Sequence, residues 1–152
     1  MNRKAVFFDA DGTLCDMEKG VPQSTKEALK KLRENGHDAW LCTGRSRAFV
    51  SRYLEELPFT GMISACGATI ELVPKGFNKA VGILAVCRLF DIPWEDTIVF
   101  GDSNNDLAMF EYAAVKVAMG NGSEKIKALA DHITQDMFHY GIRNGLEYLK
   151  LI

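Results

Sequence analysis

Short apolar runs recur along the chain, and most are followed by a polar stretch that carries a glycine. The first run, residues 5–8, has no polar alternation, which is typical of a strand buried on both faces of a sheet. The run at 62–64 is expected to be the third strand of the same sheet. All the predicted strands are 5–8, 38–42, 62–64, 68–73, 97–100, 115–119 and 132–134, the last a small edge strand.

Residues at helical spacing separate these strands. Ser24 and Glu27 form a capping box at the start of the first predicted helix, which Asn35 and Gly36 end. Asn78 and Ser123 are expected to cap two later helices. The predicted helices are 24–34, 46–57, 80–91, 107–110, 123–129 and 140–149.

Strands that alternate with helices over short connections predict an α/β fold, a Rossmann-like doubly wound parallel sheet with helices on both faces. Ligands of such folds bind beyond the carboxyl ends of the strands. The polar stretches that follow three of the strands would therefore meet at one edge of the sheet, although they are far apart in sequence: 9–13, 43–46 and 101–106.

Composition narrows the class of protein. The chain has 152 residues, 47% apolar and 25% charged, which suits one globular domain, and its net charge of −2 gives no reason to expect a nucleic-acid partner. No apolar run approaches the ~20 residues of a membrane span, so no membrane partner is expected. The widely spaced cysteines favour reduced thiols in a cytoplasmic protein over a zinc site: Cys15, Cys42, Cys66 and Cys87.

Asp9 and Asp11 follow the first strand directly. In an extended segment, side chains two residues apart point the same way, so these carboxylates would repel each other unless a cation lay between them. A turn in which Asp11 and Gly12 merely end the strand is the alternative, because Asp and Gly are common turn residues. Gly12 would allow a turn that a side chain would obstruct.

Four motifs, taken in order, resemble those of the haloacid dehalogenase superfamily of phosphohydrolases, and within it the Cof-like sugar-phosphate and cofactor phosphatases. The resemblance spans nearly the whole chain, and the combination of motifs is more specific than any single one. The motifs are Asp9-x-Asp11-Gly12-Thr13-Leu14, Thr43-Gly44-Arg45, Lys79 at a helix start, and Gly101-Asp102-x-x-Asn105-Asp106.

The resemblance implies a magnesium-dependent phosphomonoesterase that acts on small phosphorylated metabolites such as sugar phosphates. Asp9 would be the nucleophile that forms an aspartyl-phosphate, and Asp11 the general acid and base. Mg²⁺ would be held by the Asp9 carboxylate, the Asp11 main-chain carbonyl and Asp102. Asp106 would orient a metal-bound water or Lys79.

Phosphate binding is implied for a second group of residues. The Thr43 hydroxyl and the Gly44 amide would bind phosphoryl oxygens, and Lys79 would neutralise charge in the transition state. Asn105 would contact the substrate or the waters of the metal site. Taken alone, a threonine at a strand end is usually a cap and a lysine at a helix start is usually solvated.

Several other residues have less specific expectations. Arg45 and Arg47 are expected to contact the substrate or to form surface ion pairs. The histidines match none of the motifs and are expected to be surface or structural residues, and the tryptophans to be packing residues: His37, His132, His139, Trp40 and Trp94.

The chain departs from Cof-like relatives in one respect. Those relatives carry a cap domain between the third strand and the helix of the motif lysine, and here the expected insertion near 72–76 is absent. We therefore expect a single core domain, 1–152, with an open site and relaxed specificity or reduced activity. A homo-oligomer in which a neighbouring subunit covers the open site is a further expectation.

Two other functions fit the same residues. A phosphotransferase of the superfamily, such as a phosphomutase, would use the same aspartyl-phosphate. A non-enzymatic module similar to receiver domains would combine an acidic Mg²⁺ pocket with a phosphorylated Asp, a Thr and a Lys. Asp11 and the Thr43-Gly44-Arg45 motif favour the phosphatase over the receiver-like module.

Overall fold

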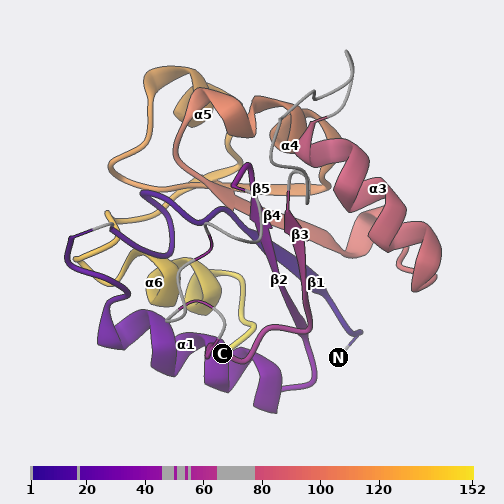
Figure 1. Cartoon of the computed structure of the whole chain (residues 1–152), viewed down its shortest axis with the longest axis horizontal. Helices are drawn as coiled ribbons and strands as arrows, with labels where there is room; N and C mark the ends of the chain where they lie inside the picture. Colours follow the sequence, from indigo (N-terminus) through magenta and orange to yellow (C-terminus); the bar gives the residue numbers. More distant parts are fainter. Residues whose placement is uncertain (1, 17, 46–49, 51–53, 55, 65–77) are drawn as a thin grey trace.

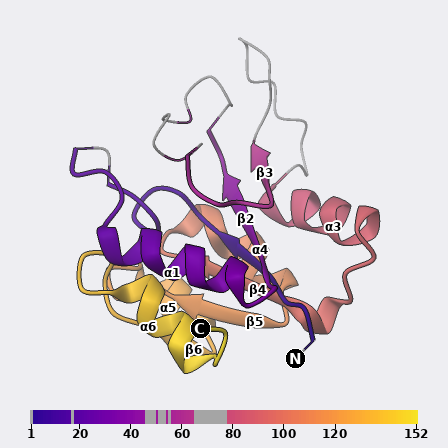
Figure 2. The same ribbon diagram turned by 90° about the horizontal axis from the view of Figure 1, so that it is seen from below.

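The computed structural model of the chain describes residues 2–16, 18–45, 50, 54, 56–64 and 78–152. Within these residues, one sheet of parallel strands runs in the order β3-β2-β1-β4-β5-β6, and Figures 1 and 2 together label its strands. The strands are β1 (Ala5–Phe8), β2 (Asp38–Thr43), β3 (Gly61–Ser64), β4 (Thr97–Gly101), β5 (Val115–Ala118) and β6 (His132–Ile133). The predicted α/β fold is confirmed, and β3 is the predicted third strand beside β2.

Helices cover both faces of the sheet (Figures 1 and 2). One face is covered by α1 (Gln23–Glu34) and α6 (Gly141–Tyr148), which pack against each other. The other face is covered by α3 (Lys79–Leu89), α4 (Leu107–Tyr112) and α5 (Glu124–Leu129), and two 3₁₀ turns, η2 (Trp94–Asp96) and η3 (Asn104–Asp106), flank β4.

The strand β1 is buried throughout because it has a sheet partner on each side and helices above and below. Its alternate side chains enter two separate cores. Val6 and Phe8 pack into the cluster that contains the α1 and α6 side chains, whereas Ala5 and Phe7 pack into the cluster that contains those of α3, α4 and α5. An apolar run without alternation is thus explained by burial on both faces.

Helix starts agree with the prediction at two positions and differ at one. The side chains of Asn78 and Ser123 accept hydrogen bonds from the amides of Val81 and Ile126, as expected of N-caps. The capping box predicted at Ser24 is wrong: α1 begins at Gln23 after Pro22, and no side chain caps it. Because α1 begins before Ser24, this serine lies inside the first turn and cannot be the N-cap residue.

The two tryptophans differ in burial. Trp40 lies in the core, stacked on Phe7 at 6.2 Å between ring centroids. Trp94 is 55% exposed, which makes the prediction of a packing residue wrong there, although its indole donates to the Tyr112 carbonyl at 2.5 Å. A polar indole N–H allows tryptophan to lie at the surface with one edge bonded.

The histidines have structural partners. His37 is buried, its Nδ1 accepts from the Lys4 amide at 3.2 Å, and burial lowers its pKa. His132 stacks on Tyr148 at 3.7 Å between ring centroids. The predicted helix at 46–57 falls largely outside the described residues, as do the strand at 68–73, the expected insertion point, Arg47 and Cys66. No helix in the described part is long and apolar enough to cross a membrane.

Candidate active site

Two acidic side chains lie where the central strands end. Asp9 follows β1, and its amide donates to the Phe100 carbonyl at 3.0 Å, so the ladder between β1 and β4 continues into this residue. Asp102 follows β4 immediately. Since β1 and β4 are parallel neighbours, residues more than ninety positions apart meet at the carboxyl edge of the sheet.

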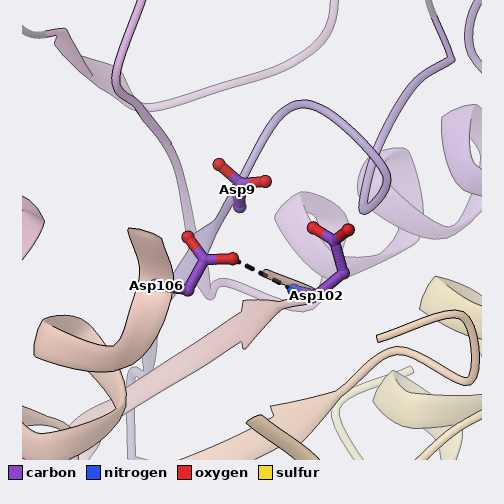
Figure 3. A group of neighbouring side chains, drawn as sticks. All are labelled: Asp9, Asp102 and Asp106. Carbon is purple, nitrogen blue, oxygen red and sulfur yellow. Dashed lines mark hydrogen bonds between the residues drawn. The ribbon is translucent and has the colours of Figure 1, made fainter. Parts of the chain in front are cut away.

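Asp9, Asp102 and Asp106 form a group of three carboxylates, here called the acidic triad, in which one oxygen of each lies within 4.8 Å of the others (Figure 3). Asp9 and Asp106 are buried, and Asp102 is partly buried. Burial, followed by the charge of Asp106, raises the pKa of Asp9 to about 7 and that of Asp102 to about 6. The ionised forms of Asp9 and Asp102 are therefore less favourable in this site than they would be in water.

Lys79 is the cation of this site. It is the first residue of α3, 8% exposed, and its ammonium donates to the Asp9 carboxylate and to Asp106 Oδ1, the latter at 2.5 Å. Burial alone would lower the pKa of Lys79, but the charges of Asp9 and Asp106 outweigh it and the pKa is raised. The lysine is therefore held charged between two carboxylates.

Asp106 connects the lysine to the loop after β4. Its Oδ2 accepts from the amides of Asp102 at 3.0 Å and Ser103 at 3.1 Å, while its Oδ1 faces Lys79. The Ser103 side chain completes a capping box over η3. Both oxygens of Asp106 are thus engaged, one with Lys79 and the other with the backbone of the loop that carries Asp102, and its supporting role at a metal site stays a prediction.

Gly12 allows the first motif to approach Asp102. Its φ of +80° favours glycine, and a Cβ built there would lie 2.3 Å from Asp102 Oδ2. Next to it, the Thr13 hydroxyl donates to Asp102 Oδ1 at 3.2 Å, and the side-chain amide of Asn121 donates from Nδ2 to the Gly12 carbonyl at 2.8 Å. Gly12 thus explains why the predicted turn lies against the site.

Sequence reasoning assigned no role at this site to Thr13, Asn121 or Ser123. The Ser123 amide donates to the Asp102 carbonyl at 2.8 Å, so the loop after β5 fixes the backbone of Asp102. Thr13 stood within the quoted motif, which was the available signal. The segment that contains Asn121 and Ser123 could have been suspected only because a glycine pair and a helix cap follow β5 there.

The expected arrangement of Asp9 and Asp11 is wrong. The strand β1 ends at Phe8, and the chain turns so that the amides of Leu14 and Cys15 donate to the Ala10 carbonyl. The alternation of an extended segment therefore does not apply. Asp11 does not belong to the acidic triad, and its carboxylate pairs with Arg45 at 2.7 and 2.8 Å.

Two of the predicted phosphate ligands, Thr43 and Gly44, lie at the end of β2, beside β1. Thr43 is buried and its hydroxyl accepts from the Arg45 amide at 3.1 Å, whereas Gly44 is exposed. Asn105 is exposed on η3, and its side chain is hydrogen-bonded to the Ser103 hydroxyl. The structure thus brings together Asp9, Lys79, Asp102 and Asp106, and links Asp11 to the Thr43 segment through Arg45.

The donor atoms of the acidic triad suit a hard divalent cation. Carboxylate oxygens are the ligands that Mg²⁺ prefers, and Mg²⁺ commonly keeps waters alongside one or two carboxylates. Burial, followed by the charge of Asp106, raises the pKa of both Asp9 and Asp102, and a bound cation would favour their ionised forms. Asp9 and Asp102 therefore fit the role of metal ligands.

Comparison with known proteins identifies the family. The profile of haloacid dehalogenase-like hydrolases matches residues 6–71 and 66–146. The chain belongs to this family. The 5-amino-6-(5-phospho-D-ribitylamino)uracil phosphatase YitU of Bacillus subtilis is 41% identical over 83 residues, which are 54% of this chain and 31% of the relative. YkrA of the same organism is 23% identical over an alignment of 256 residues that covers 100% of each chain.

A solved structure of this haloacid dehalogenase family agrees with the fold. The sugar phosphatase BT4131, of subclass IIB, superposes with a TM-score of 0.88 at 23% identity, covering 98% of this chain and 100% of that chain. The predicted superfamily and its phosphatase class are confirmed by these matches. The metal, the intermediate and the substrate stay predictions.

Proposed function

We propose that this haloacid dehalogenase family member is a Mg²⁺-dependent phosphomonoester hydrolase that acts through an aspartyl-phosphate on Asp9. The observation that carries the proposal is the position of Lys79, whose ammonium joins Asp9 to Asp106 within the acidic triad. A carboxylate and a phosphate group are both negatively charged and repel each other. A fixed cation beside the carboxylate, at the carboxyl edge of a parallel sheet, offsets this repulsion so that the carboxylate can approach phosphorus.

Asp9 attacks phosphorus in the first step, and the bond to the leaving oxygen breaks as the Asp9–phosphorus bond forms. Lys79 offsets charge on the phosphoryl oxygens and on Asp9. When bound, Mg²⁺ supplies Lewis-acid stabilisation of that charge, with Asp9, the Asp11 carbonyl and Asp102 as its ligands. Asp106 holds the Lys79 ammonium and the Asp102 backbone in place.

Asp11 is proposed to donate a proton to the leaving oxygen and then to take one from the water that hydrolyses the aspartyl-phosphate. The Thr43 hydroxyl and the Gly44 amide bind phosphoryl oxygens. Asn105, exposed beside the triad residue Asp106, contacts the substrate or the waters of the metal site. These roles follow the family pattern at the matching positions.

The substrates proposed are small phosphorylated metabolites such as sugar phosphates, in keeping with the sugar phosphatase among the structural neighbours. We also propose that residues 1–152 form one core domain without a cap. The two profile matches meet at 66–71, and the alignment with YkrA is roughly a hundred positions longer than this chain, which supports an insertion that the relative has and this chain lacks. An uncapped site should discriminate poorly among substrates.

A second copy of the chain can cover an active site that has no cap. We propose a homo-oligomer, and sedimentation velocity at micromolar concentration checks it, because a single monomeric species would contradict it. The buried thiols of Cys15, Cys42 and Cys87 suit the reducing cytoplasm that we propose as the location.

The first experiment measures hydrolysis of p-nitrophenyl phosphate with Mg²⁺ and with EDTA. We expect metal-dependent turnover that Asp9→Asn reduces at least about a thousandfold, since the nucleophile is lost. Asp131→Asn, an exposed aspartate paired with Lys116 far from the triad, serves as the matched control. Equal activity in wild type and Asp9→Asn, or turnover unchanged by EDTA, would contradict the mechanism.

A further inference from the structure

Arg45 and Asp11 form an ion pair at the rim of the site. The guanidinium donates from Nε to Asp11 Oδ2 at 2.7 Å and from Nη2 to Oδ1 at 2.8 Å, so that both carboxylate oxygens are engaged. This two-pronged geometry is specific to arginine. Each oxygen of a carboxylate held in this way already accepts a hydrogen bond from the guanidinium, so the arginine competes with a leaving group for the carboxylate.

The pair spans two segments that the proposed reaction uses. Asp11 follows β1, and the amide of Arg45 donates to the hydroxyl of Thr43, a proposed phosphate ligand. Arg45 directly follows Gly44 in the chain, so a phosphoryl group bound by Thr43 and Gly44 would lie near Arg45. Its charge of about −2 competes with the single charge of Asp11 for the same guanidinium.

The backbone near Asp11 is held by hydrogen bonds, whereas the side chains of the Arg45–Asp11 pair are partly exposed. The Gly12 amide donates to the Cys15 carbonyl at 3.0 Å, and the Gly12 carbonyl accepts from Asn121. The side chains of Arg45 and Asp11 are 27% and 44% exposed. A partly solvated ion pair shifts an equilibrium by no more than about fivefold, so a dianion can displace it.

We infer that Arg45 is a positioning residue that exchanges partners: it holds the Asp11 carboxylate in the free protein and turns to the phosphoryl group when one binds. Asp11 is then released to act at the leaving oxygen. The inference rests on the proposed function, because it assigns the trigger that frees the general acid. Phosphate binding and release of Asp11 thus become one coupled event.

The exchange has a thermodynamic signature that a fixed arginine lacks. If Asp11 competes with phosphate for Arg45, then Asp11→Asn should tighten phosphate binding more in a chain that has Arg45 than in a chain that lacks it. If Arg45 only shields the charge of Asp11, removing the arginine exposes that charge, and Asp11→Asn should help more in the chain without Arg45. The two readings predict couplings of opposite sign.

The test is a double-mutant cycle in which the affinity of each variant for inorganic phosphate is measured by calorimetry at saturating Mg²⁺. We expect Asp11→Asn to tighten binding about threefold to fivefold when Arg45 is present and by less in the Arg45→Ala chain. Arg45→Ala alone should weaken binding, and Arg45→Lys, which keeps the charge without the fork, should retain part of the coupling. Arg143→Ala, which removes an exposed arginine paired with Glu147, should change nothing.

The outcomes separate this inference from the proposed function. An equal or larger effect of Asp11→Asn in the Arg45→Ala chain overturns the exchange, even where Mg²⁺-dependent hydrolysis shows that the enzyme is a phosphatase. Loss of measurable binding in both chains that lack Arg45 supports the exchange, because mere shielding would leave the chain with Asn at position 11 unaffected. Melting curves by circular dichroism check that all variants are folded.

Discussion

The metal-free protein should lose stability as the pH rises, because Asp9 is buried in the acidic triad. The unfolded chain releases the Asp9 proton near the ordinary pKa of 3.8, whereas the folded chain holds it until about 7. Between these values the folded state binds more protons, so the free energy of unfolding falls with increasing pH. The stabilisation is fully present below about pH 4 and is lost as the pH passes through about 7.

The size of this effect follows from the two pKa values. At about 1.4 kcal/mol per pH unit, the interval from 3.8 to about 7 gives an upper value of about 4 kcal/mol. Water entry and side-chain relaxation around a buried charge reduce it, and we expect about 2 kcal/mol. Urea unfolding in EDTA at a series of pH values measures the change.

Asp9→Asn is the decisive comparison, because asparagine keeps the shape of the side chain and does not titrate. The decline between about pH 5 and 8 should be shallower in this variant, and addition of Mg²⁺ should flatten the wild-type curve by favouring the ionised carboxylate. Parallel curves for wild type and Asp9→Asn in EDTA, or a wild-type stability that rises over this interval, would refute the reasoning.

Two further substitutions test other parts of the structure. Gly12→Ala should destabilise the fold by about 1–3 kcal/mol and weaken Mg²⁺ binding, because the new Cβ would meet Asp102 at a φ of +80°; thermal melts and Mg²⁺ titration measure both, and unchanged Mg²⁺ affinity would contradict the role of Gly12. Asp38→Asn should cost about 2–4 kcal/mol, since the buried carboxylate accepts from Arg3 and Arg33 and these bonds hold its pKa low against burial. That contribution is lost as the pH falls through the lowered pKa of Asp38, so urea unfolding should show the gap between variant and wild type closing in acid.

The sheet and its acidic edge could be predicted because burial on both faces and polar strand ends are local patterns. The unbroken apolar run before Asp9 specified a central strand, and β1 indeed has neighbours on both sides. The motif spacing also placed Lys79 at a helix start, where Asn78 caps α3. These features depend on residues close together in the chain.

What could not be predicted depends on contacts between distant segments. The pairing of Asp11 with Arg45 joins residues 34 positions apart, and it follows from a turn whose geometry the alternation rule does not describe. Thr13 and Asn121 hold the loop around Gly12 through bonds that no local pattern indicates. The exposure of Trp94 likewise depends on how η2 meets α4.

The start of α3 closes its own first turn. The Asn78 side chain accepts from the Val81 amide at 3.2 Å, so the helix begins with a bond between residues that both belong to its N-terminus. The position of the Lys79 backbone on this helix is therefore set by the helix and by its packing on the sheet. The contact of Lys79 with Asp9 therefore depends on a helix cap that belongs to α3 itself.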